Sequence, residues 1–242
     1  MVRSIIFIWF CITSLALEGQ VNAYKVPHAP VVPMIDGQAD FIWQKPEWSP
    51  NWREIVSSEE ALYRTRFKAL WDEEYLYLIF EVIDPDIKAQ GVIDHEPLFQ
   101  FDNIIEVFLD AGADQRDYYE LQVNARGTRW ELTLNRPYKD GGEAKSPDEL
   151  EGLTYAIHLD GTLNNSEDKD HAWHLEMRLP WSAIPGVNHV PPSSVFKANF
   201  SRVFQDDEDI GTGPTYWLWQ PMGLPNIHIP DRWGRLIFLP KN

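Results

Sequence analysis

The chain has 242 residues, of which 44% are hydrophobic, and it carries a formal net charge of −16 at pH 7. An acidic surface of this kind repels phosphate groups, so nucleic acid and anionic membranes are excluded as partners. The length suits one large all-β domain whose core needs no disulfides.

Residues 1–23 are predicted to be a signal peptide. Arg3 precedes the apolar run "IIFIWFCITSLAL", and the small-residue site "VNA" follows, which predicts cleavage after Ala23. A run of about 13 residues is too short for a membrane-spanning helix, which needs about 20. The single cysteine, Cys11, lies in this segment, so the mature chain is expected to hold no disulfide. We therefore expect a secreted or periplasmic protein without membrane insertion.

After an extended, proline-containing segment at residues 24–33, one domain is predicted over residues 34–242. Runs rich in β-branched and aromatic residues, separated by turns such as "DEE", "ARG" and "LDG", predict strands. About ten are expected, at residues 64–70, 75–83, 103–111, 118–125, 128–134, 153–159, 172–179, 195–203, 216–220 and 233–239. Because helical periodicity is almost absent, the pattern predicts an all-β fold, an antiparallel β-sandwich of two packed sheets.

The strand predicted at residues 103–111 contains a single glutamate, Glu106, on the same face as Ile104 and Phe108. The alternate residues are also apolar, so both faces are expected to be covered and the strand to be central. A carboxylate in this place costs several kcal/mol unless it is paired. We expect Glu106 either to pair with a buried cation such as Arg66 or Lys68 or to await a ligand.

Polar side chains also alternate on neighbouring predicted strands. Glu120, Gln122 and Asn124 share one face of residues 118–125. A second polar row follows on a later strand: Lys197, Asn199 and Ser201. If these rows lie near Glu106, they form a polar trough with paired donors and acceptors, which suits sugar hydroxyls. The alternative is the solvated face of an antiparallel sheet.

Several motifs resemble the family 9 carbohydrate-binding modules, and in particular the family 9-like exported proteins that stand alone. They are "IDGQAD", "LWDEEYLYLIFEVIDPDI", "DNIIEVFLD", "YYELQVNARGT", "LPW", "ANFSRV" and "RWGRLIF", and they span about Ile35 to Leu239. The resemblance implies a two-sheet sandwich that binds sugars in polysaccharide breakdown, with structural calcium. It also implies a site made of a glutamate, an arginine, an asparagine and two tryptophans. Glu106 and Asn124 match two of these positions, whereas Gln122 stands at that of the arginine.

The two tryptophan positions of the family are not retained. The chain offers "PLFQFD" near the first and "NIHIPDRW" near the second. Aromatic platforms remain available, although tryptophan and tyrosine in sandwiches also fill cores. The predicted carbohydrate-binding residues are Glu106, Gln122, Asn124, Phe99, Trp217 and His228.

The loop "DAGADQRD" sets Asp110, Asp114 and Asp117 near a turn glycine, which suits calcium with oxygen ligands. It lacks the spacing of an EF-hand, and a solvated acidic loop is the alternative. No histidine lies in a zinc motif, and no organic cofactor is expected.

Three functions follow from these patterns. The first is non-catalytic carbohydrate binding, and the second is glycoside hydrolysis by paired carboxylates, Glu106 and Glu120. The third is a redox module with b-type haem held by Met222 and His228. Binding is favoured, because no nucleophile motif accompanies the carboxylates. The sequence leaves the sugar and the oligomeric state open.

Overall fold

The computed structural model describes residues 21–94, 96–145, 151–187, 189–190, 193–205 and 213–241. Within these ranges the chain forms a nine-stranded and a four-stranded sheet. The first sheet contains β1 (Ala23–Val26), β2 (Arg53–Glu54), β5 (Ile104–Asp110), β6 (Tyr118–Asn124), β7 (Arg129–Leu134), β8 (Ala144–Lys145), β11 (Val195–Phe204), β12 (Thr215–Leu218) and β13 (Gly234–Phe238). The second contains β3 (Thr65–Trp71), β4 (Tyr75–Ile83), β9 (Thr154–Asp160) and β10 (Ala172–Pro180).

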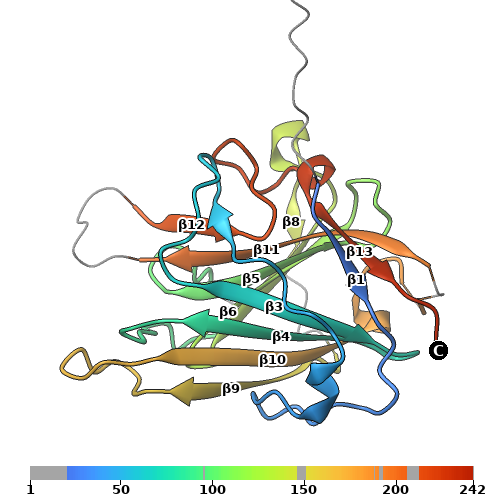
Figure 1. Ribbon diagram of the computed structural model, residues 1–242. Coiled ribbons are helices and arrows are strands. Elements are labelled where there is room, and N and C mark those ends of the chain that lie inside the picture. Colours follow the sequence, from blue (N-terminus) through green and yellow to red (C-terminus); the bar gives the residue numbers. More distant parts are fainter. Residues whose placement is uncertain are drawn as a thin grey trace, which may run out of the picture.

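The main path of the large sheet is β1-β13-β11-β5-β6-β7-β8, and β12 joins at β11 and carries β2. The small sheet has the order β3-β4-β10-β9, and these strands run side by side in the lower half of Figure 1. In the described loops there are four 3-10 helices: η1 (Phe41–Gln44), η2 (Tyr138–Asp140), η3 (Trp181–Ala183) and η4 (Pro230–Arg232). None of the helices in the described ranges has the length and apolar character needed to cross a membrane.

The predicted all-β sandwich is confirmed, and each of the ten predicted strands overlaps an observed one. Three strands of two to four residues were not predicted: β1, β2 and β8. Among the strands of the described ranges the pairing is antiparallel apart from β1, which runs parallel to β13 and includes residues expected to be merely extended. Such short strands arise from pairing with distant residues, which local patterns do not reveal.

The main core lies between the two sheets. Trp173, Leu175, Met177 and Leu179 of β10 point into it, as their alternation predicts. The inward face of β5 contributes Ile105, Val107 and Leu109 to the same cluster. β5 itself lies between β11 and β6, and all seven of its residues are buried. The prediction of a central strand is therefore confirmed.

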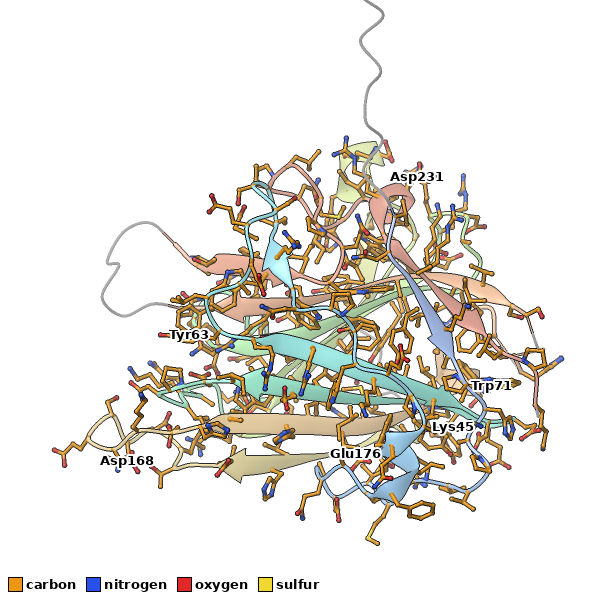
Figure 2. All side chains as sticks on the ribbon, viewed as in Figure 1. Lys45, Tyr63, Trp71, Asp168, Glu176 and Asp231 are labelled. Atoms are coloured by element: carbon orange, nitrogen blue, oxygen red, sulfur yellow. The ribbon has the colours of Figure 1, made fainter. Side chains whose placement is uncertain are left out.

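The outer face of β10 is not uniformly solvated, as the alternation of the strand alone would indicate. Glu176 is fully buried, because the N-terminal segment around η1 folds over it. Its carboxylate accepts hydrogen bonds from Trp43 Nε1 (2.8 Å) and from the backbone N–H groups of Asp36 and Gly37 (3.0 Å each). Figure 2 shows Glu176 beside this segment. The carboxylate thus fastens the segment to the sheet.

Candidate functional site

A pocket of about 320 Å³ lies on the outer face of the large sheet, opposite the main core. Glu106 from β5 and Glu120 and Gln122 from β6 belong to the lining and share the outward-facing positions of these paired strands. The other lining residues are Ile55, Phe99, Trp130, Tyr138, Tyr216, Pro225, Asn226, Ile227 and His228. They come from β7, η2, β12 and three loops, so segments far apart in the sequence meet over one strand pair.

Gln122 joins the two carboxylates. Its Nε2 donates to Glu106 Oε1 (3.2 Å) and to Glu120 Oε1 (2.8 Å). Its Oε1 accepts the backbone N–H groups of Leu98 and Phe99, each at 3.1 Å. The amide is therefore fixed from both ends, and it also holds the loop that carries Phe99 against the pocket.

Glu106 remains without a cation. Arg66 lies on β3 in the other sheet, where its Nε donates to Glu81 Oε2 at 2.6 Å. Lys68 on the same strand donates to the carbonyl of Trp43. The alternative in which Glu106 pairs with Arg66 or Lys68 is therefore wrong, because both cations have other partners and Glu106 lines a pocket on the outer face of the other sheet. Within the described residues Glu106 Oε2 has no hydrogen-bond partner, although Glu106 is only 3% exposed.

Burial and mutual repulsion shape the charge of the pocket. Burial raises the pKa of Glu106 well above its ordinary range, and the nearby Glu120 carboxylate raises it further. Burial likewise raises the pKa of Glu120. His228 Nε2 lies 3.9 Å from Glu120 Oε2, but burial lowers the pKa of His228 to about 4. The imidazole is thus neutral at pH 7 and supplies no counter-charge.

Aromatic rings form much of the wall. Phe99 and Trp130 lie 6.3 Å apart between ring centroids, and Tyr138 packs edge-on against His228 at 4.8 Å. Tyr118 fixes the histidine ring through a hydrogen bond of 3.1 Å between its hydroxyl and His228 Nδ1. Rings around a polar floor are suited to a ligand with an apolar face and polar edges, such as a sugar.

Four of the six predicted binding residues line the pocket: Glu106, Gln122, Phe99 and His228. The structure places Asn124 and Trp217 elsewhere. Asn124 is fully buried, and its Nδ2 donates to Asp102 Oδ2 (2.8 Å) and to the Gly91 carbonyl (3.0 Å). The ring of Trp217 is stacked on Phe204 at 5.1 Å, in the core. Both side chains therefore stabilise the fold and do not line the pocket.

The second polar row contributes little to the pocket. Lys197 forms an ion pair of 2.8 Å with Asp231, and Asn199 bonds the backbone of Gln220. Ser201 lies directly opposite Glu106 in the register of β11 and β5, and its hydroxyl lowers the pKa of that carboxyl, although it forms no hydrogen bond of ordinary geometry in the described part of the chain. The trough is thus reduced to the part near Glu106, Glu120 and Gln122.

Sequence reasoning missed Trp130 and Tyr216 as pocket residues. Trp130 lies opposite Gln122 in the hairpin of β6 and β7. The short "ARG" turn between these strands could have revealed that register. Tyr216 adjoins the predicted Trp217, and neighbouring residues of a strand face opposite sides. The aromatic pair was therefore located, but the wrong member was chosen to face the ligand.

The proposed haem ligands have separate surroundings. Met222 is buried in a cluster with Ile55 and Trp233, and its sulfur lies 3.5 Å from Asn199 Nδ2. His228 lines the pocket, whereas Met222 is absent from the lining. The structure therefore does not bring the two side chains together around one cavity.

The acidic loop after β5 was predicted to bind calcium. In the described residues no three His, Cys, Asp or Glu side chains gather as a metal site, so Asp110, Asp114 and Asp117 do not fit a site made of side chains alone. Asp110 Oδ2 accepts the N–H of Gln115 at 2.9 Å, whereas its buried Oδ1 has no partner. A calcium ion here would need backbone carbonyls and water beside Asp110.

Calcium binding by this loop stays a prediction. Millimolar calcium is expected to raise the melting temperature of metal-stripped protein, because a ligand that binds only the native state stabilises it. Asp110→Asn should abolish the shift, and magnesium provides the control for ionic strength. Identical melting curves with and without calcium would exclude the site.

Comparison with known proteins identifies the family of the chain. Residues 35–240 match the model of the family described as carbohydrate family 9 binding domain-like. An exoglucanase XynX of Acetivibrio thermocellus is 32% identical over 156 residues, which are 64% of this chain and 12% of the relative. Endo-1,4-beta-xylanase C of Paenibacillus barcinonensis is 26% identical over 158 residues, or 62% of this chain and 14% of the relative. The chain thus corresponds to a small part of these enzymes.

Solved structures share the fold. A carbohydrate-binding candidate from Bacteroides uniformis superposes with a TM-score of 0.70 and 20% identity, covering 90% of this chain and all of that chain. A family 9 carbohydrate-binding module from Caldicellulosiruptor kristjanssonii, solved with cellotriose, gives 0.64 and 18% identity over 91% of this chain and 95% of that chain. Family match and shared fold agree, and the chain belongs to the carbohydrate family 9 binding domain-like family.

Proposed function

We propose that the chain binds a carbohydrate, without catalysis, in the pocket over β5 and β6. The observation that carries this proposal is a polar floor of Glu106, Glu120 and Gln122 enclosed by aromatic rings. Carboxylate and amide groups are suitable partners for sugar hydroxyls, and rings suit the apolar face of a pyranose. The structures of the Caldicellulosiruptor module with glucose and with cellotriose support the same class of ligand.

The direct test is calorimetric titration of residues 24–242 with glucose, cellotriose and xylose oligomers. We expect saturable binding of at least one of them. Gln122→Leu should weaken it, because the leucine cannot donate to Glu106 or hold the Phe99 loop. Asp231→Asn, which alters a charge outside the pocket lining, is the matched control. Absence of binding to every sugar would contradict the proposal.

Catalysis is the less favoured alternative, although two carboxylates share the pocket. A glycosidase places its two carboxyl groups on either side of the bond that it breaks. Glu106 and Glu120 instead stand on adjacent strands of one sheet and bond the same amide nitrogen. Both carboxyl groups would therefore contact a bound ligand from the same side. Aryl glycosides should stay intact on prolonged incubation, and release of aglycone that disappears with Glu120→Gln would favour hydrolysis instead.

Export and a part in polysaccharide breakdown complete the proposal. The curated relatives are xylanases and an exoglucanase, of which the matched region forms a small part. The apolar run near the N-terminus, followed by "VNA", supports cleavage after Ala23. N-terminal sequencing of protein recovered from the periplasm or the medium should give Tyr24 as the first residue. A chain that still begins at Met1 would contradict this prediction.

A further inference from the structure

The pocket holds two carboxylates without a cation. Among its lining residues in the described part of the chain there is no lysine or arginine. The other titratable groups that line it are His228, Tyr138 and Tyr216, and Tyr118 stands behind the histidine. Burial keeps the imidazole neutral at pH 7 and raises the pKa of each of the three phenols, so these groups are uncharged as well.

The hydrogen bonds of the floor are also incomplete. Gln122 donates one bond to each carboxylate through its Nε2, and so has no further hydrogen to offer. Glu106 Oε2 accepts no hydrogen bond of ordinary geometry within the described residues, and Glu106 is only 3% exposed. The Ser201 hydroxyl opposite it lowers the pKa of the carboxyl, but by less than burial raises it. A ligand that donates hydrogen bonds here would bind the ionised form of Glu106, which burial disfavours in the free protein. A donor that also carries a positive charge would stabilise the ionised forms of both nearby carboxyl groups most strongly.

A protonated primary amine supplies both hydrogen-bond donors and a positive charge. An ammonium group has three N–H donors and one positive charge, so it can bond two carboxylates at once. The aromatic wall of Phe99, Trp130, Tyr138 and Tyr216 suits the same group, because ring faces attract cations. The volume of about 320 Å³ lies at the lower end for ligand pockets, which limits the occupant to a small molecule or the end of a chain.

We propose that the pocket prefers sugars that carry a free amino group to their neutral counterparts, with the ammonium seated between Glu106 and Glu120. The proposal rests on the function proposed above and narrows its ligand class. Gln122 is central to it, because the neutral amide that joins the two carboxyl groups brings them no positive charge. In the free protein burial therefore raises the pKa of both groups, and a bound ammonium would favour their ionised forms.

The test compares glucose, glucosamine and N-acetylglucosamine by calorimetry on residues 24–242 at about pH 7, where a protonated amine can draw both carboxyl groups into their ionised forms. The acetylated sugar keeps the ring and the nitrogen but removes the charge. We expect glucosamine to bind at least about tenfold more tightly than either of the others, which corresponds to about 1.4 kcal/mol. Glu120→Gln should bring the ratio of affinities for glucosamine and glucose close to one, and thermal melting will establish that this variant is folded.

The possible results separate the two proposals. If glucose binds and glucosamine binds no more tightly, the amine preference is refuted and carbohydrate binding stands. If neither these sugars nor the oligosaccharides bind, both proposals fall. If Glu120→Gln still prefers glucosamine, the ammonium does not bind between Glu106 and Glu120, and this part of the proposal is refuted.

Discussion

Replacing Asp84 with alanine is expected to lower the free energy of unfolding by about 3–5 kcal/mol, because it leaves a buried arginine without its partner. Asp84 Oδ2 lies 2.9 Å from Arg202 Nη2, and the two side chains are 2% and 1% exposed. The guanidinium is surrounded by the rings of Trp217, Phe204 and Tyr63. Arg202 would keep its hydrogen bond to the Ile83 carbonyl (2.8 Å) but lose the charge that balances its own.

The pair itself is not expected to be a large source of stability. Burial raises the pKa of Asp84 by more than the charge of Arg202 lowers it, so the carboxylate ionises less readily here than in water. The expected loss of stability arises because the charge of the buried Arg202 is left unbalanced, and not because the ion pair itself is strongly favourable. The double variant Asp84→Ala with Arg202→Met should therefore recover much of the lost stability.

Denaturant titration of the two variants and the wild type measures these effects. Lys241→Ala provides the matched control, because it breaks an ion pair with Glu73 in which both side chains are 62% exposed. Its unfolding curve should match that of the wild type. If Asp84→Ala behaved like this control, the buried pair would have no part in holding the two sheets together.

The strands could be predicted from the sequence because period-two alternation is a local property. β10 illustrates both the strength and the limit of this argument. Its inward residues were predicted correctly, but the burial of Glu176 on its outer face depends on the path of the segment around η1. That path is set by contacts between residues more than 130 positions apart. No local pattern encodes it.

The same limit explains the candidate site. Alternation placed Glu120 and Gln122 on one face of their strand and left open whether Glu106 lies near them; the structure brings the three together. Asn124 follows the same alternation, yet the loop that holds Gly91 and Asp102 folds over it and takes up its amide. The route of that loop could not be derived from its residues.

The sequence also could not predict whether Glu106 pairs with a cation or binds a ligand. A buried cation and a ligand were both reasonable, since Arg66 has the residue type and the strand context of a partner. The decision depends on which sheet each strand joins. β3 pairs with β4, which brings Arg66 to Glu81 instead. Sheet membership is set by long-range pairing, for which a single sequence offers little signal.

Glu106→Gln is expected to weaken the binding of a neutral sugar by about 10- to 100-fold. Above about pH 8, where Glu106 is ionised, the carboxylate can accept charge-assisted hydrogen bonds from sugar hydroxyls. Each is worth about 1.5–3 kcal/mol, and about 1.4 kcal/mol corresponds to a tenfold change in affinity. Calorimetric titration with the sugar that the wild type binds best gives the ratio of dissociation constants. The substitution keeps the size of the side chain, so the shape of the pocket is preserved.

The stability of the same variant should not fall and should rise near neutral pH. The folded protein raises the pKa of Glu106 above the ordinary value of 4.5, by burial and by the charge of Glu120. Between the unfolded and the folded pKa the native state binds more protons than the unfolded state, so the wild type loses stability as pH rises through this window. Glu106→Gln removes one carboxylate of the pair. Its unfolding free energy should therefore fall less between about pH 5 and about pH 8.

Glu81→Gln is the matched control, because this glutamate has the cations that Glu106 lacks. Burial alone would raise the pKa of Glu81, but the hydrogen bond and charge of Arg66, together with Arg64, lower it overall. Removing its charge should reduce stability at neutral pH and leave sugar affinity unchanged, since β4 lies in the other sheet. The two substitutions are thus expected to change stability in opposite directions, and only Glu106→Gln is expected to change sugar affinity. If Glu106→Gln instead lost stability and kept its affinity for sugar, Glu106 would be a structural residue, and the ligand would have to bind away from the strand that carries it.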